Sequence, residues 1–398
     1  MQKWIVCSAL VLIFGLGVHA VTSPTAKVAS ANSKFGLSLY SQLHQRAESK
    51  NIFFSPSSVS WCLSMLFNGA GGSTKQEMAQ ALQISGLSLQ ELNSAYGEWR
   101  NTFVNPDPKV EIDIANSIWS RRGLAFKPEF LQTNKNFYAA EVSELDFNDP
   151  QSLLTINSWV KNKTRGKIEK IIDQISADSV LFLINAIYFK GKWAKEFDPA
   201  KTKEQNFNTS PGKQEHVKMM HQHGDYQYQE QPEFQSVSLA YGNGRLKMHV
   251  FLPSKDFGLS KFHQMLTHAN WEKWMTQYEE SEGNIGLPRF RIEYETTLND
   301  ALKALGMKNA FDPAQADFGG MITGSQRPFV SQVKHKAFVE VNEEGTEAAA
   351  ATSTEIRIVS MPIPKKTFQM IVDRPFFFAI RDNSTGAVLF MGSVSDPV

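Results

Sequence analysis

The stretch from Glu343 to Ser360 reads EEGTEAAAATSTEIRIVS and has the features of a β-strand that could join a sheet. From Thr346 onward, alternate residues are small or apolar, as the inward face of a strand requires; they are Thr346, Ala348, Ala350, Thr352, Thr354 and Ile356. The opposite set includes Glu347 and Glu355, which suit water. Gly345 can act as a swivel, and no proline lies between it and Met361. Consecutive alanines also form helices readily, so the pattern alone leaves the segment between two states.

This stretch resembles the hinge of the serpins, serine protease inhibitors that trap their targets by inserting a loop into a sheet. Further segments resemble serpins in the same order along the chain: NIFFSPSSVSWCLSMLFNGAGGST (51–74), INSWVKNKTRGKI (156–168), LINAIYFKGKW (183–193), LPRFRIEYETTLNDALKALGM (287–307), HKAFVEVNEEGTEAAAAT (335–352) and RPFFFAIRDNSTGAVLFMGSVSDP (374–397). They span nearly the whole chain after residue 20, so the resemblance covers more than the hinge.

The order of apolar patterns indicates an α+β protein. Helical spacing dominates early, in Phe35–Leu43 and Val59–Phe67, and Thr74 with Glu77 has the form of a capping box that opens another helix. Leu181–Tyr188 is almost continuously apolar, which is typical of a central strand covered on both faces.

Alternating or short apolar runs predict further strands, at 110–114, 290–294, 368–372, 376–381 and 388–394, and helical spacing returns over 297–307. The resemblance implies one domain over residues 21–398. It would have a large mixed central sheet, two smaller sheets, eight or nine helices and an exposed reactive-centre loop at about residues 345–364.

The resemblance also implies a mechanism. A serine protease would attack the loop and form an acyl-enzyme, after which the cut strand would enter the large sheet and carry the protease with it. About fourteen residues at ~3.3 Å each span some 45 Å, far more than is needed to disturb a catalytic site. The alternative is a carrier or storage protein on the same fold, whose loop does not insert. The small inward-facing residues favour insertion.

The resemblance predicts the scissile bond, because serpin loops are usually numbered from the hinge glycine to the bond that is cut. The count from Gly345 gives Val359–Ser360, and a slip of one residue gives Ile358–Val359. Either bond would suit an elastase-like or chymotrypsin-like protease, whereas Arg357 would select a trypsin-like one. The run from Val359 to Arg374 is several residues longer than is common, so the register stays open. A cysteine protease target is a further alternative, since its acyl-enzyme chemistry is similar.

The hinge residues by the same resemblance are Glu343, Gly345, Thr346, Glu347, Ala348, Ala349, Ala350 and Ala351. Residues that match serpin positions governing the opening of the sheet are Ser55, Asn185, His335, Trp193 and Arg289. The first three match a buried polar cluster, although His335 could equally be an ordinary core histidine with satisfied hydrogen bonds. Trp193 matches an aromatic residue at the top of the sheet, and Arg289 matches the partner of Glu343 in a charge pair.

The N-terminal residues predict secretion. Lys3, an apolar run from Trp4 to Val18 and a small residue at Ala20 read as a signal peptide over residues 1–20, which would make the protein extracellular, or periplasmic in a bacterium. Three glycosylation acceptors, Asn162, Asn208 and Asn383, would matter only in a eukaryotic secretory pathway.

Other features exclude competing classes of function. The net charge is +1, which favours neither nucleic acid nor an anionic membrane as partner, and we expect a monomer. We expect no cofactor and no metal, because His216, His221 and His223 lack the spacing of a metal site. Cys62, at helical spacing among apolar residues, reads as a buried thiol. Three Ser-x-x-Lys matches lack the accompanying hydrolase motifs, so we expect no enzyme.

Overall fold

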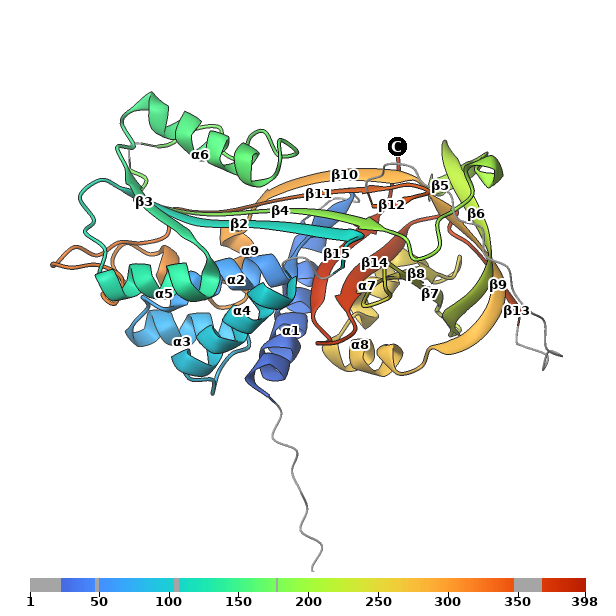
Figure 1. The fold of residues 1–398 in the computed structure, drawn as a ribbon, viewed down its shortest axis with the longest axis horizontal. Coiled ribbons are helices and arrows are strands. Elements are labelled where there is room, and N and C mark those ends of the chain that lie inside the picture. The colour runs from blue at the N-terminus through green and yellow to red at the C-terminus, as the bar shows by residue number, and fades with distance from the viewer. Residues whose placement is uncertain (1–22, 47–49, 104–106, 177, 347–366) are drawn as a thin grey trace, which may run out of the picture.

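The computed structural model describes residues 23–46, 50–103, 107–176, 178–346 and 367–398. Within these ranges the chain forms nine α-helices, α1 (Pro24–His44), α2 (Pro56–Phe67), α3 (Gly72–Ala81), α4 (Leu89–Phe103), α5 (Pro128–Tyr138), α6 (Pro150–Lys163), α7 (Gly258–Met265), α8 (His268–Met275) and α9 (Asn299–Ala304). Two short 3₁₀ turns are η1 (Pro199–Lys201) and η2 (Asn309–Phe311). The first five helices gather beneath one half of a long sheet (Figure 1), so the predicted α+β class is confirmed.

The long sheet has six strands in the order β10 (Phe290–Thr297), β11 (Gln332–Val341), β12 (Gly345–Thr346), β4 (Leu181–Lys192), β2 (Val110–Arg121) and β3 (Glu141–Leu145). It is mixed, because β11 and β4 pair in parallel while β2 and β4 are antiparallel. The predicted central strand is β4, whose first nine residues, Leu181 to Phe189, are all buried, as is Gly191.

The remaining strands form one continuously hydrogen-bonded sheet in the order β1 (Ile52–Phe54), β15 (Val388–Val394), β14 (Phe376–Asp382), β8 (Leu246–Pro253), β7 (Phe234–Ala240), β6 (Lys213–Glu230), β9 (Glu279–Pro288) and β13 (Thr367–Ile371), with β5 (Lys203–Ser210) also on β6. It has two arms, β1 to β7 and β5 with β9 and β13. The 18-residue strand β6 belongs to both, since only its last residues pair with β7. These two arms correspond to the two smaller sheets that the resemblance implies.

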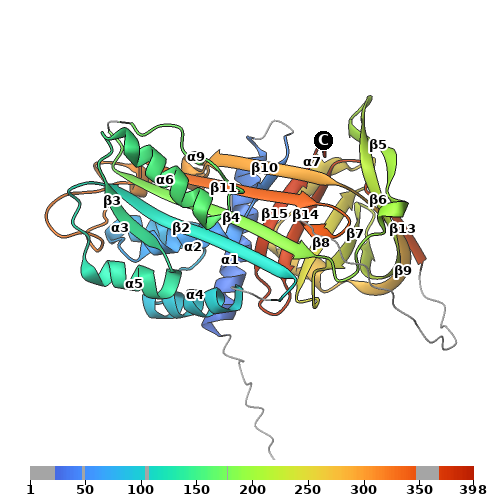
Figure 2. The ribbon, with the colours of Figure 1, turned by 45° about the horizontal axis from the view of Figure 1, so that its top comes forward.

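Two apolar clusters hold the six-stranded sheet. Its inner face packs on the main core, where α2 is so enclosed that all twelve of its residues are buried. Its outer face carries a second cluster, in which Ile156 and Val160 of α6 meet Phe182 and Ile184 of β4. Figure 2 shows α6 lying across the outer face of β2 and β4. Any rearrangement of this sheet must therefore also change the packing of α6 against it.

The predicted capping box at Thr74 is wrong. α3 begins two residues earlier, at Gly72, with Gly71 as its N-cap. The Thr74 hydroxyl accepts a hydrogen bond from the Asp317 backbone N–H at 3.0 Å, and Glu77 accepts the backbone N–H groups of Lys308 and Asn309. The two side chains are used to fix a distant loop, which sequence spacing does not reveal. The other helices and strands predicted within the described residues are present.

Candidate functional site

A seam runs along the six-stranded sheet between β4 and β11. Seven residue pairs close it in parallel, from Phe182–Gln332 to Tyr188–Phe338. Beyond Tyr188 the two strands no longer pair, and β12 lies between them, with Thr346 opposite both Val341 and Gly191. At this end the sheet is thus already one strand wider than along the closed part of the seam.

Gly345 permits this arrangement because no side chain would fit there. Its φ is +148°, and a Cβ would lie only 2.0 Å from the Gly191 carbonyl oxygen and 2.6 Å from the Lys192 Cα. The close approach of two backbones is a common reason for glycine in a strand. Gly345, which the sequence predicted to allow a change of chain direction, therefore also lies in direct contact with β4.

An aromatic pair lines the position where β12 enters the sheet. Trp193 stacks on Tyr241, with ring centroids 4.4 Å apart. The Trp193 indole N–H donates to the Asn342 carbonyl at 2.9 Å, and its backbone N–H donates to the Glu344 carbonyl at 2.9 Å. The Tyr241 and Thr346 hydroxyls lie 2.8 Å apart and share a hydrogen bond, and both residues are fully buried. Burial raises the pKa of Tyr241, which keeps this hydroxyl neutral.

The segment just before β12 is held by a charge pair. Arg289 donates from Nε and Nη2 to Glu343 Oε1 at 2.9 and 2.7 Å, and Thr202 donates to the same oxygen at 2.5 Å. Burial alone would raise the pKa of Glu343, but the hydrogen bonds from Arg289 and Thr202 outweigh it and hold the pKa below its usual value. Glu343 is therefore ionised at neutral pH, and it anchors the segment that leads into β12.

Below β12, on the inner face of the seam, Ser55, Asn185 and His335 form one buried cluster. His335 Nδ1 lies 2.5 Å from Asn185 Oδ1, and the Ser55 backbone N–H donates to His335 Nε2 at 3.3 Å. These partners require the neutral tautomer with its proton on Nδ1. Burial lowers the pKa of His335 to about 3, which agrees with a neutral ring.

Four partners of these residues were not identified from the sequence. Asn185 also donates to Ser58 and to the Asn116 side-chain oxygen, so it joins β4 to α2 and β2. Tyr241 and Thr202 contact the predicted hinge residues from positions more than 100 residues away in the sequence. No local sequence pattern identifies these residues, because their hydrogen bonds are to residues that become neighbours only in the folded protein.

The remaining predicted loop residues, Glu347, Ala348, Ala349, Ala350, Ala351, Arg357, Ile358, Val359 and Ser360, lie outside the described residues, as does the predicted signal peptide over residues 1–20. The structure therefore tests neither the position of the scissile bond nor the leader. No helix among the described residues is both long and apolar enough to cross a membrane.

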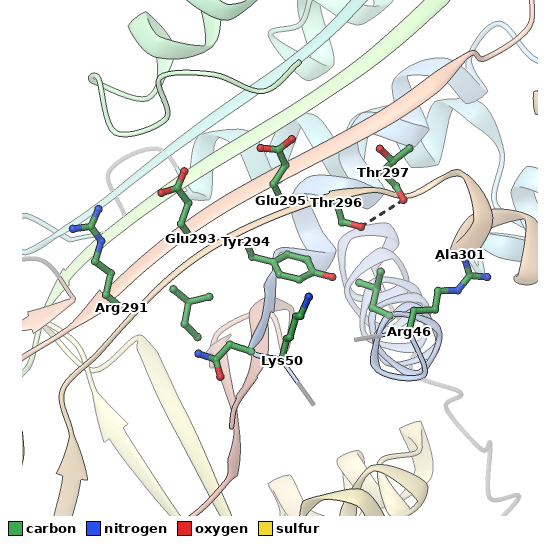
Figure 3. A pocket seen from close by; sticks show the side chains of 12 residues that line it. Arg46, Lys50, Arg291, Glu293, Tyr294, Glu295, Thr296, Thr297 and Ala301 are labelled. Carbon is green, nitrogen blue, oxygen red and sulfur yellow. Dashed lines mark hydrogen bonds between the residues drawn. The ribbon is translucent and has the colours of Figure 1, made fainter. Parts of the chain in front are cut away.

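Other candidate groups lie apart from the seam. Cys62 is fully buried, and burial raises the pKa of its thiol to about 12. His223 pairs with Glu282 at 3.1 Å, and within the described ranges no three His, Cys, Asp or Glu residues gather so as to hold a metal. A cavity of about 480 Å³ follows the free edge of β10 (Figure 3). There Tyr294 points toward Lys50, whereas Glu293 leaves the strand on the opposite side.

Comparison with known proteins identifies the family. The family model described as serpin (serine protease inhibitor) matches residues 30–397, and the chain belongs to the serpin family. It is 34% identical to human leukocyte elastase inhibitor over 383 residues, covering 93% of this chain and 100% of that protein. Human Serpin B8 is 36% identical over 377 residues, covering 92% of this chain and 98% of the relative. The family and these relatives are inhibitors and not enzymes.

Solved structures agree on the fold. The native state of the thermophilic serpin tengpin matches with a TM-score of 0.84 and 30% identity, over 93% of this chain and 94% of that one. Human thyroxine-binding globulin in complex with its ligand matches with a TM-score of 0.85 and 28% identity, over 94% and 100% of the two chains. Because an inhibitor family and a thyroxine-binding protein share this fold, the fold alone does not decide between inhibition and ligand carriage.

The prediction of secretion is wrong. Human Serpin B11, leukocyte elastase inhibitor and Serpin B8 are intracellular clade B serpins without signal peptides, and this similarity points away from export. The prediction rested on a local pattern, Lys3 followed by the apolar run from Trp4 to Val18 and small Ala20.

Proposed function

We propose that this chain inhibits a serine protease as a suicide substrate, by inserting its cleaved loop into the seam between β4 and β11. The observation that carries the proposal is the position of β12, whose Thr346 side chain is fully buried while Gly345 meets β4. The cleaved loop would only have to extend the existing pairing of β12 with β4 and β11. The similarity to leukocyte elastase inhibitor supports a protease as partner.

The pairing of β12 supports one register for the proposed inserted strand. Thr346 lies opposite Gly191 and Gly345 opposite Lys192, so an antiparallel continuation brings Glu347 to Lys190 and Thr352 to Asn185. Against β11, the pair Thr346–Val341 continues to Thr352 opposite His335. The inward-facing residues of the loop are then Ala348, Ala350, Thr352 and Thr354, all small enough for the core side of a sheet.

The residues around the seam have distinct roles in this proposal. Trp193 and the pair Glu343–Arg289 hold the hinge at the entrance. Ser55, Asn185 and His335 close the seam with neutral hydrogen bonds, and these bonds would exchange partners when Thr352 arrives between Asn185 and His335. Neutral bonds can be broken without exposing a buried charge, so the seam can open at moderate cost.

Insertion would supply the energy to stall the protease. Seven parallel pairs are given up, and about ten residues of the new strand gain antiparallel partners on both sides. At a net ~0.5–1.5 kcal/mol for each hydrogen bond, the gain is on the order of 10 kcal/mol. A displacement of ~1 Å at a catalytic site can slow a reaction about 10²-fold, so this energy is ample to prevent deacylation.

The scissile bond in this proposal is Val359–Ser360, which suits an elastase-like or chymotrypsin-like protease. The test is to incubate the chain with elastase, chymotrypsin and trypsin, run denaturing gels, and sequence the small C-terminal fragment. We expect a stable band at the summed mass and a fragment that begins at Ser360. A fragment that begins at Val359 or Ile358 would move the bond by one or two residues. Cleavage without such a band from any protease would refute inhibition and favour a carrier.

A further inference from the structure

Two histidines meet where the end of α1 lies against α7. His44 is the last residue of α1 and His263 lies on α7, so 219 positions of sequence separate them. His44 Nε2 lies 2.7 Å from His263 Nδ1. Both residues are half-buried, so solvent reaches the pair. The fold thus brings two side chains that can bind a metal to one point near the surface.

The two imidazole rings lie partly side by side rather than end to end. Their centroids are 3.6 Å apart and their planes are inclined at 59°. A straight N–H···N bond of 2.7 Å between two imidazoles would hold the centroids about 5 Å apart. The hydrogen bond between His44 and His263 is therefore bent, and a bent bond is weaker than a straight one. Little is lost when a third atom takes both nitrogens as its partners.

Tyr40 supports the far side of the His263 ring. It precedes His44 by one helical turn on the same face of α1, and it is fully buried. Its hydroxyl lies 2.7 Å from His263 Nε2. A metal-binding histidine usually has such a hydrogen-bond partner on its second ring nitrogen, which fixes the ring and its tautomer. With the proton on Nε2 and the Tyr40 oxygen as its acceptor, His263 Nδ1 presents a lone pair toward His44.

Both rings are neutral at neutral pH. Burial lowers the pKa of His263 to about 3, and the neighbouring His44 contributes to this shift. Burial also lowers the pKa of His44. Imidazole binds a metal in its neutral form, so a metal displaces no proton from this pair at neutral pH. Two neutral nitrogen ligands beside solvent suit Zn²⁺, Ni²⁺ and Cu²⁺, whereas Mg²⁺ and Ca²⁺ prefer oxygen ligands.

We infer that His44 and His263 form a binding site for a late first-row divalent metal ion, Zn²⁺, Ni²⁺ or Cu²⁺, with water in the remaining positions. This site is independent of the proposed function. Metal–imidazole bonds are about 2.0–2.1 Å long, so two nitrogens at neighbouring positions on one metal lie about 3.0–3.4 Å apart. The rings must separate by roughly half an ångström from their present 2.7 Å. His44, at the end of its helix, can provide this movement.

A metal at this point would join α1 to α7. The two ligands come together only in the folded chain, so the metal binds the folded state in preference to the unfolded one. The melting temperature should therefore rise with metal concentration once that concentration exceeds the dissociation constant. A local spacing of histidines cannot predict such a site, because the two ligands belong to distant segments.

The experiment removes bound metal from the full-length chain with EDTA, dialyses the EDTA away, and titrates the chain with Zn²⁺, Ni²⁺ and Cu²⁺ in a calorimeter. We expect one site per chain, with Cu²⁺ bound most tightly, and no binding of Mg²⁺. H44Q should weaken Cu²⁺ binding about ten-fold or more and abolish the rise in melting temperature. H44Q leaves the bond between Tyr40 and His263 in place, and an unchanged melting temperature in EDTA will show that it folds.

The matched control uses a second pair of histidines. His221 and His223 lie two positions apart on β6, and His223 pairs with Glu282 at 3.1 Å. H221Q combined with H223Q should bind the metals as the wild type does. If this variant loses the site while H44Q keeps it, the metal binds on β6 and the inference is wrong. Equal affinities of the wild type and H44Q would overturn it in the same way.

Replacing Tyr40 by phenylalanine tests whether Tyr40 is a positioning residue for this site. Y40F keeps both ligands but removes the partner of His263 Nε2, so we expect one site per chain with about ten-fold lower affinity. An unchanged affinity would contradict this role of Tyr40. A chain that binds metal at the pair but forms no protease complex would contradict only the proposed function, and the converse result would contradict only the metal site.

Discussion

Replacing Thr346 by arginine tests whether the inward face of the loop decides between trapping and simple cleavage. Thr346 is fully buried in β12 and shares a hydrogen bond with Tyr241, so a guanidinium at this position has no room and no anionic partner. Burying an unpaired charge costs several kcal/mol. The arginine would therefore stay in water, and the first step of insertion would be lost.

The size of the effect follows from the competition between insertion and deacylation. If the barrier to insertion rises by ~4 kcal/mol, insertion slows about 1,000-fold. Most acyl-enzymes would then hydrolyse, and the protease would be released active. We expect Thr346→Arg to be cleaved at the same bond as the wild type but to form little or no covalent complex.

The assay mixes inhibitor and protease at a series of ratios and measures residual protease activity alongside denaturing gels. Glu347→Arg is the matched control, since strand alternation puts residue 347 on the outer face, where the same charge can remain in water. Thr346→Val tests the hydroxyl alone and should still inhibit, because leaving the buried Tyr241 hydroxyl without this partner costs only about 1–3 kcal/mol. Complex formation by Thr346→Arg at the wild-type ratio would refute the inward position of residue 346.

Two further predictions concern the middle of the seam and the end where β12 lies. His335 has a pKa of about 3 in the folded protein and 6.5 when unfolded, so the unfolded state binds more protons between these values and stability falls as pH drops from 6.5 toward 3. At pH 5 the loss is about 2 kcal/mol, and urea unfolding of His335→Gln should lack that part of the pH dependence; equal slopes would contradict it. Gly345→Ala would place a methyl group against Gly191, so β12 should leave the sheet and expose Glu344 to a glutamate-specific protease. Gly319→Ala, where the added methyl meets only an ordinary contact at 3.4 Å, should be cut no faster than the wild type.

Local sequence patterns predicted the parts of the fold that depend on one segment at a time. The unbroken apolar run at Leu181–Tyr188 predicted a strand covered on both faces, and β4 is covered by α2 on one side and α6 on the other. The helices α1 and α2 and the C-terminal strands followed from apolar spacing in the same way. A buried helix or strand has apolar residues at the spacing of its own buried face, so this spacing can be found in a single sequence.

Contacts between distant segments were not predictable in this way. The hydrogen bond between Tyr241 and Thr346 joins residues 105 positions apart, and neither has neighbours in sequence that indicate the other. Arg165 reads as an ordinary exposed cation after a helix, and only the packing of α6 on β2 brings Glu111 and Asp113 to it. Thr74 and Glu77 have the spacing of a cap but bind another loop instead.

The seam also explains why its buried polar cluster is built from neutral groups. A charged His335 would need an anionic partner, and that ion pair would have to be separated whenever a strand enters between β4 and β11. The neutral ring bonds Asn185 through Nδ1 and accepts from Ser55 at Nε2, and each bond is worth only about 1 kcal/mol net. In the proposed mechanism, breaking these bonds to open the seam therefore costs little free energy compared with the gain from a new strand. The same neutrality makes the protein lose stability in acid, because the unfolded chain takes up a proton on His335 at a higher pH than the folded protein does.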